Sequence, residues 1–277
     1  MVTTNYWHGA YLSPPSGWTQ QQVLDDYDRV IGAILSHTLA YGYPEPLFMG
    51  LDEADGQSLT GQIPLYQKIH AKGGRSWAAV YSDYYDTLGA YGDLIDFPNM
   101  YLGDAIVDYS SVLADVHNDN HRMWTYFHPQ SGVELPYLYR HNYGLWMWAA
   151  GFDGACDFSY MWTFGSSLWD DFDDVNGSRE LNFVYPTSTG VVDTIEWEGF
   201  REGVDDVRYV STLENLIAQC KAGRSAGNAI YDAGVREEAY LERLKARLQT
   251  GLVGENQVSA IRAALLRKCQ ALAALNP

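Results

Sequence analysis

The sequence predicts an α/β protein of the (β/α)8 TIM barrel type. Short apolar segments alternate with stretches of helical spacing, and this rhythm is typical of a parallel sheet with right-handed crossovers. No GxGxxG follows a predicted strand and no GxxxxGK[ST] occurs, which argues against a nucleotide-binding doubly wound sheet. The predicted strands end in acidic and aromatic residues, and barrels carry their functional residues at the carboxyl ends of strands.

Five segments are predicted as strands because each is short, rich in aromatic or β-branched residues and followed by a polar or glycine-containing loop. They are residues 47–53, 76–82, 99–104, 122–128 and 155–162, with weaker candidates at 6–12 and 182–186. Helical spacing marks residues 20–38, 60–72, 84–95, 105–117 and 136–150. A full barrel has eight strands in about 250 residues. We therefore expect a barrel that is incomplete or irregular at its N-terminal strands, or a piece of a longer protein.

The last part of the chain is predicted to be a helical extension. Two helices are expected within residues 226–277, the first ending at Gly251. The second carries an apolar stripe at steps of three or four: Val258, Ile261, Leu265, Cys269 and Leu272. Such a stripe packs either on the barrel flank or on a partner subunit, and we favour the flank. The predicted domains are thus a barrel over 1–225 and a helical hairpin over 226–277.

Composition narrows the function classes. The chain has 18 Lys+Arg against 35 Asp+Glu, a formal charge of -17, which disfavours nucleic acids and anionic membranes as partners. Nine Trp and 21 Tyr supply rings that fill cores and also stack on sugars. The seven His form no HExxH, and Cys156, Cys220 and Cys269 form no CxxC, so we expect no metal or other cofactor. No signal peptide is visible at the start, and the compartment stays open.

An acidic pair, Asp52 and Glu53, ends the strand in PLFMGLDEADG. Two carboxyl groups beside a buried strand cost free energy unless they are solvated, paired or used. A carboxyl group with a raised pKa can protonate a leaving-group oxygen, and a second can support positive charge as a glycosidic bond breaks. The alternative is a solvated loop acid followed by a helix N-cap at Asp55.

Other predicted strand ends supply candidate sugar-binding residues. Trp162 lies at the open end of the strand in ACDFSYMW, as a sugar subsite or as a packing residue, and Asp157 lies nearer its start. From Thr194 onward a helix is predicted, with ion pairs at i,i+3 and i,i+4 that we interpret as structural. The charged residues are Glu198, Arg201, Glu202, Asp205, Asp206 and Arg208.

Taken in order, these stretches resemble the catalytic domain of glycoside hydrolase family 123, a superfamily of N-acetyl-β-galactosaminidase-like enzymes. The similarity covers roughly residues 45–215. Its motifs are LDEA at the acidic pair, Arg140, Asp153-Gly154, Trp162, Tyr185-Pro186 and FREGVDDVRY at 200–209.

The resemblance implies a β/α barrel and retaining hydrolysis of a β-linked N-acetylhexosamine, assisted by the substrate's acetamido group. It implies that Glu53 is the general acid/base and that Asp52 orients the acetamido group. Trp162 and Tyr126 or His128 would line the sugar site.

The leading hypothesis is therefore a glycoside hydrolase with a carbohydrate substrate. A second hypothesis is a glycosidase of other specificity, in which Glu53 is the acid and Asp104 or Asp157 the nucleophile, about 5–5.5 Å away. A third is a non-catalytic module that binds glycans or assembles with a larger protein. The predicted substrate-binding residues are Trp162, Tyr126, His128, Tyr81, Asp104, Asp157 and Arg140.

Overall fold

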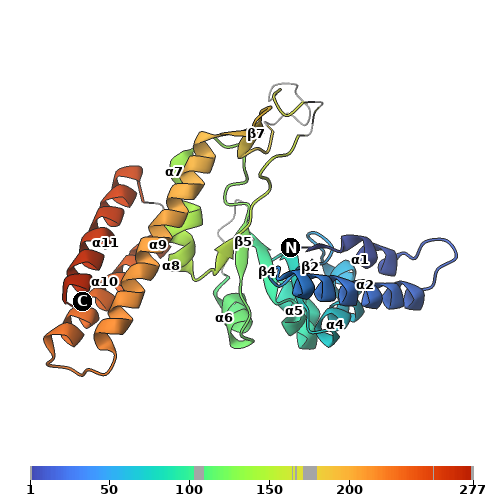
Figure 1. The fold of residues 1–277 in the computed structure, drawn as a ribbon, viewed down its shortest axis with the longest axis horizontal. Helices are drawn as coiled ribbons and strands as arrows, with labels where there is room; N and C mark the ends of the chain where they lie inside the picture. Colours follow the sequence, from blue (N-terminus) through green and yellow to red (C-terminus); the bar gives the residue numbers. More distant parts are fainter. Residues whose placement is uncertain are drawn as a thin grey trace. The chain divides into compact units, whose positions relative to one another are not determined.

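A computed structural model describes residues 2–102, 109–163, 165, 167–170, 180–251 and 253–275, and its ribbon is drawn in Figure 1. The chain divides into two compact units. Residues 1–127 and 153–156 form the first, which we call the sheet unit. Residues 128–152 and 157–277 form the second, which we call the helical unit.

The sheet unit is built on six parallel strands that lie side by side in the order in which they occur along the chain. A doubly wound sheet would instead reverse its strand order at a switch point. The strands are β1 (Val2–Thr3), β2 (Leu47–Met49), β3 (Arg75–Val80), β4 (Phe97–Tyr101), β5 (Trp124–Tyr126) and β6 (Gly154–Ala155).

Helices fill the connections between these strands. They are α1 (Asn5–Leu12), α2 (Gln20–Tyr41), α3 (Gly56–Thr60), α4 (Ile63–Ala71), α5 (Tyr84–Leu88), the 3-10 helix η1 (Gly89–Leu94) and α6 (Ser110–Asn118). The longest, α2, begins in a capping box between Thr19 and Gln22 and ends at Gly42 with a φ of 66°. Such caps satisfy the orphan amide and carbonyl groups at helix ends.

The two faces of the sheet carry different side chains because neighbouring residues on a strand point to opposite sides. One face presents Trp77, Ala79, Phe97 and Tyr126 as a buried cluster. Residues that alternate with these, such as Phe48, Ala78 and Met100, are also buried. Burial on both faces is typical of parallel sheets.

The helical unit is built around α9 (Ile195–Lys221), which begins at the Thr194 cap. In Figure 1, α9 runs beside α10 (Ala229–Gln249) and α11 (Glu255–Leu275), and the three share one apolar core. The unit also holds α7 (Pro136–Arg140), the π-helical turn η2 (His141–Trp146), α8 (Met147–Ala150) and an antiparallel pair, β7 (Val184–Pro186) and β8 (Val191–Asp193).

Close backbone contact joins α7 to α9. A Cβ atom built on Gly203 would lie 2.8 Å from the carbonyl oxygen of Arg140, and one on Gly199 would lie 2.1 Å from that of Pro136. Only glycine allows so close an approach.

The prediction of an α/β fold with a parallel sheet is confirmed. Within the described residues β1 and β6 each have one neighbour, so the sheet is open and forms no closed eight-stranded barrel. The five main strands start where predicted to within about two residues, although β6 (Gly154–Ala155) includes only Ala155 of the predicted 155–162 segment. The helix at Thr194, the two tail helices and the buried stripe on α11 are confirmed.

Two weaker predictions need correction. Residues 6–12 form part of helix α1, because helical geometry lets His8 reach partners in α2 and before α4. A short aromatic run cannot by itself distinguish strand from helix. Residues 184–186 are a strand, but they pair with β8 outside the parallel sheet.

The tail helices pack on α9, so the predicted boundary at residue 225 falls inside the helical unit. In the described part of the chain, no helix has both the length and the apolar character needed to cross a bilayer.

Candidate functional site

The acidic pair occupies a tight turn at the carboxyl end of β2. Asp52 and Glu53 follow the strand after two residues, and Asp55 then stands at the N-cap of α3. Glu53 has a φ of 47°, a left-handed conformation that is uncommon for a residue with a side chain. Both acidic side chains are exposed at this edge of the sheet. The turn therefore presents two neighbouring carboxyl groups to solvent.

Two tyrosines from neighbouring strands hold the Glu53 carboxyl group. The hydroxyl of Tyr81, one residue beyond β3, donates to Glu53 Oε2 at 3.1 Å. The hydroxyl of Tyr126, the last residue of β5, donates to Glu53 Oε1. Residues that follow β2 and β3 and the last residue of β5 thus meet at one carboxyl group, as expected where parallel strands end at a common edge.

A third tyrosine packs between them. Tyr101 ends β4, and its ring makes edge contacts with Tyr81, 5.7 Å between centroids, and with Tyr126, at 5.5 Å. The ring of Phe127 lies against that of Tyr101, with 4.9 Å between the ring centroids. The rings leave the phenol groups little freedom to turn away from Glu53.

Burial and neighbouring charges shift the pKa values of Asp52 and of the two phenols. Partial burial, and then the nearby charge of Glu53, raise the pKa of Asp52 above its usual value. Burial followed by interactions with Glu53 raises the pKa values of Tyr126 and Tyr81. Both phenols therefore stay protonated at neutral pH and act as donors to Glu53.

Asp52, Glu53, Tyr81 and Tyr126 are thus the predicted site residues that the structure brings together, all in the sheet unit. Asp104 lies outside the described residues. His128, Arg140, Asp157 and Trp162 belong to the helical unit.

Within the helical unit, Trp162 has 48% of its surface exposed and lies 5.4 Å from Phe158. The ring of His128 lies 4.7 Å from Trp146, and its backbone N–H donates to the Tyr143 hydroxyl at 2.8 Å. Burial and then the charge of Asp157 raise the pKa of Tyr143. Trp162 is thus a predicted substrate-binding residue whose ring is open to solvent.

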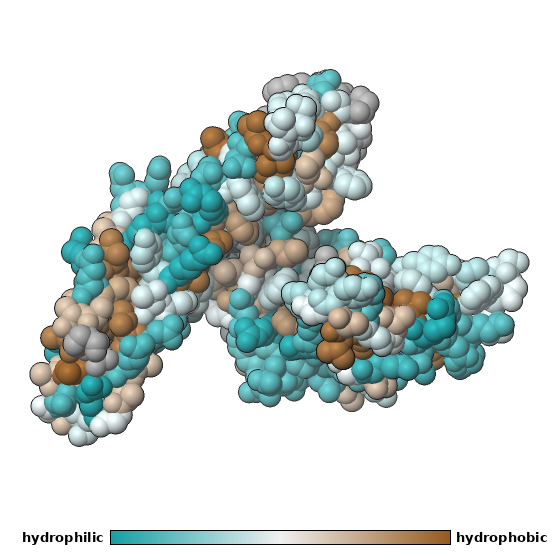
Figure 2. All heavy atoms as spheres, in the orientation of Figure 1, coloured by the Kyte–Doolittle hydropathy of each residue, from teal (hydrophilic) through white to brown (hydrophobic). Residues whose placement is uncertain are grey.

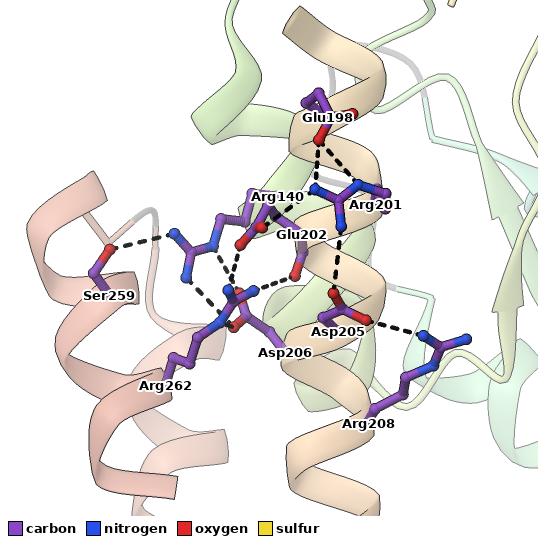
Figure 3. A network of polar contacts seen from close by, with 9 residues as sticks. All are labelled: Arg140, Glu198, Arg201, Glu202, Asp205, Asp206, Arg208, Ser259 and Arg262. Atoms are coloured by element: carbon purple, nitrogen blue, oxygen red, sulfur yellow. Dashed lines mark hydrogen bonds and ion pairs between the residues drawn. The ribbon is translucent and has the colours of Figure 1, made fainter. Parts of the chain in front are cut away.

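Arg140 has a structural position. Its Nε donates to Asp206 at 2.8 Å, its Nη1 donates to Ser259 at 3.3 Å, and Asp206 is fully buried (Figure 3). Arg262 also donates to Asp206 and to Glu202. The guanidinium groups thereby link α7 and α11 to α9 around a carboxylate that would be costly to bury unpaired.

The predicted ion pairs along α9 are confirmed. The guanidinium group of Arg201 has a nitrogen 2.5 Å from a carboxyl oxygen of Glu198 and another 3.7 Å from one of Asp205. A guanidinium nitrogen of Arg208 lies 2.9 Å from the other Asp205 oxygen. Figure 2 shows hydrophilic side chains gathered over α9 on this face. Exposed pairs of this kind contribute little free energy individually.

Three residues on the face of the sheet that carries Tyr126 were not singled out from the sequence: Tyr101, Asn99 and Trp77. Tyr101 lies inside a predicted strand and could have been found as its outward-facing end residue. Asn99 and Trp77 are buried on the same face, and within the described part of the chain Asn99 Oδ1 and Trp77 Nε1 have no hydrogen-bond partner. Burial of an Asn and an indole N–H gives no local signal in a strand that is apolar on both faces.

The described residues contain no group of three or more His, Cys, Asp or Glu side chains arranged to hold a metal ion. The acidic turn and the tyrosines beside it present carboxyl and phenol groups. No protein-family model and no curated protein matches the chain.

Proposed function

We propose that the protein is a glycoside hydrolase that cleaves a β-linked hexosaminide by a retaining, substrate-assisted mechanism. The observation that carries the proposal is the Glu53 carboxyl group, oriented by Tyr81 and Tyr126 beside Asp52 at the carboxyl edge of the parallel sheet.

In this mechanism Glu53 in its acid form protonates the glycosidic oxygen as the bond to the anomeric carbon breaks. The acetamido oxygen of the substrate attacks the anomeric carbon and gives an oxazolinium-like intermediate. Asp52 accepts a hydrogen bond from the acetamido N–H and so orients that oxygen. Glu53, now a carboxylate, takes a proton from water as the water opens the intermediate, which regenerates the acid with net retention.

The side-by-side arrangement of the two acids supports this route. Ordinary glycosidases place two carboxyl groups on opposite sides of the sugar, and substrate-assisted enzymes are an exception to that rule. Asp52 and Glu53 are consecutive residues on one turn, which suits one proton donor and one orienting group on the same side.

The proposal extends to the scaffold and to the sugar-binding residues. The unbroken strand order supports a β/α barrel of which this sheet is an open arc, because barrels use that order. Tyr81 and Tyr126 are proposed to contact the sugar, and their hydroxyl groups at the Glu53 carboxyl group support that part.

A second candidate is glycan binding without catalysis. It is favoured by exposed rings close together in the chain, with Phe158 at 43%, Tyr160 at 50% and Trp162 at 48% exposure. Aromatic rings of this kind stack on sugar faces whether or not an acid acts on the bond.

A panel of nitrophenyl glycosides tests the proposal. Wild type is expected to hydrolyse the N-acetyl-β-hexosaminides and to leave the corresponding β-hexosides, which lack the acetamido group, almost untouched. Glu53→Gln is expected to lose about 10²- to 10⁴-fold in rate, the usual contribution of a general acid.

A thiazoline analogue of the proposed intermediate is expected to inhibit wild type competitively. Background release from every sugar by wild type would contradict the proposal. Glycan binding, measured by calorimetry, together with that background would favour the second candidate.

A further inference from the structure

A buried polar network lies directly beneath the acidic turn. Gln62, between α3 and α4, is fully buried, as are His8, Tyr27 and Thr4. Buried polar side chains are costly unless each finds its partners. Here the partners lie on both sides of Asp52 and Glu53.

The side-chain amide of Gln62 forms hydrogen bonds with Leu51, which directly precedes the acidic pair, and with Ser58 in α3, five residues after Glu53. Its Oε1 accepts from the Leu51 backbone N–H at 2.8 Å, and its Nε2 donates to the Ser58 carbonyl at 2.8 Å. Since the first partner can only donate and the second can only accept, the orientation of the amide is fixed.

His8 in turn fixes Gln62. His8 Nδ1 lies 2.7 Å from Gln62 Oε1, and because that oxygen can only accept, Nδ1 must carry the proton. Burial lowers the pKa of His8 to about 4, so the ring is neutral over the working range of most enzymes. Its Nε2 lies 3.2 Å from the Tyr27 hydroxyl.

The network also reaches the end of β2. The Tyr27 hydroxyl lies 3.1 Å from Thr4 Oγ1, and Thr4 Oγ1 donates to the Met49 carbonyl at 2.6 Å. At Gly50 a Cβ atom would meet the Tyr66 hydroxyl at 2.1 Å, so a side chain there would push the strand end off the network. Thr4 therefore holds residue 49, and the amide of Gln62 holds residues 51 and 58, so buried groups fix the chain at three points around the turn.

We propose that Gln62, with His8 behind it, is the positioning residue that sets where Asp52 and Glu53 stand. This inference rests on the proposed function of the acidic pair, but the contacts are independent of any substrate. Glu53 adopts a left-handed backbone conformation, and such a conformation persists only where its surroundings enforce it. The bonds of Gln62 on either side of the turn supply that constraint.

Gln62→Met tests the proposal, because methionine preserves volume and removes the hydrogen bonds of the side-chain amide to Leu51, Ser58 and His8. We expect kcat on the hydrolysed nitrophenyl hexosaminide to fall about 10- to 100-fold with little change in KM, since small misplacements of catalytic groups have effects of that size. The carboxyl ¹³C shifts of Asp52 and Glu53 are expected to change as well.

Ser76→Ala is the matched control. Ser76 is also fully buried, and its hydroxyl donates to the Leu94 carbonyl at 2.6 Å at the opposite end of β3 from Tyr81. Its loss removes this hydrogen bond and the hydrogen bonds of the hydroxyl with Asp96 from the same unit, without touching the acidic turn. We expect kcat to stay within about twofold of wild type after correction for the folded fraction, and the carboxyl ¹³C shifts of Asp52 and Glu53 to stay unchanged.

A folded Gln62→Met protein with wild-type kcat and wild-type carboxyl shifts would overturn the proposal. If Gln62→Met does not fold, hydrogen exchange on wild type decides. The Leu51 amide should exchange at least about 100-fold more slowly than a free amide, as its bond to Gln62 requires, and fast exchange there would refute the anchor. If wild type hydrolyses nothing, the proposed function fails, whereas the carboxyl shifts and Leu51 exchange still judge the positioning role.

Discussion

Single hydroxyl groups define the geometry of Glu53. Tyr126 is 7% exposed and Tyr81 is more open to solvent, yet both donate to the same carboxyl group. Hydrogen bonds to charged groups are typically worth about 1.5–3 kcal/mol. The phenols therefore contribute orientation to a side chain that would otherwise sample many rotamers in water.

Tyr126→Phe removes one of these donors and keeps the ring. We expect kcat/KM on the hydrolysed glycoside to fall about tenfold, equivalent to about 1.4 kcal/mol, with thermal stability nearly unchanged because Glu53 can bond to water instead. Tyr85→Phe is the control, since the Tyr85 hydroxyl donates to Asp119 at 2.5 Å elsewhere in the sheet unit. Equal losses in the two variants would show that the Tyr126 hydroxyl has no specific part in the reaction.

Among the secondary-structure elements, the two ends of the parallel strands have different tasks. The carboxyl ends carry the acidic pair and its tyrosines. The amino ends carry a different cluster, in which Asp96, just before β4, lies 2.8 Å from His70 and accepts from the Ser76 N–H at 2.7 Å. Arg75 and His121 also face Asp96, each at 3.7 Å. The ion pairs and hydrogen bonds around Asp96 join β3, β4 and α4 at the amino ends of the strands, which is a structural role.

This amino-end cluster predicts a pH dependence of stability. The hydrogen bond to Asp96 raises the pKa of His70 in spite of partial burial. Burial would raise the pKa of Asp96, but bonds from His70 and Ser76 outweigh it and lower that pKa. The His70 contribution is complete below its unfolded pKa of 6.5 and is lost as pH rises through the higher folded value.

The Asp96 contribution is present above its unfolded pKa of 3.8 and is lost as pH falls through the lower folded value. The cluster should therefore stabilise most between pH 3.8 and 6.5. Urea unfolding of wild type and His70→Gln should differ more at pH 5.5 than at pH 8.5, by up to about 1 kcal/mol. A difference that grows toward pH 8.5 would show the opposite linkage.

At the level of the whole molecule, the alternating pattern of short apolar runs and helical spacing was enough to predict a parallel α/β sheet and the order of strands β2 to β6. It was enough to place Asp52 and Glu53 at a strand end beside Tyr81 and Tyr126, because parallel strands present their carboxyl ends at one edge. The apolar stripe of α11 was also predictable, because apolar residues that recur every three or four positions indicate the buried face of a helix.

Other features depend on contacts far apart in the sequence. Helix α1 was predicted as a strand, since nothing local shows that His8 must reach Gln62, 54 positions away. Arg140 was predicted as a substrate ligand, whereas its guanidinium bonds to Asp206 and Ser259, a pairing across 66 and 119 residues. The open sheet reflects strand pairing, which the pattern of single strands does not encode.

The stereochemistry of the first-formed product tests the central claim most directly. Proton NMR during hydrolysis of a β-linked N-acetylhexosaminide by wild type should show the β-anomer of the free sugar first, with the α-anomer arising later by mutarotation, and Glu53→Gln should form neither at a comparable rate. An α-anomer formed first would mean single displacement by water and would contradict an acetamido nucleophile supported by Asp52 and Glu53.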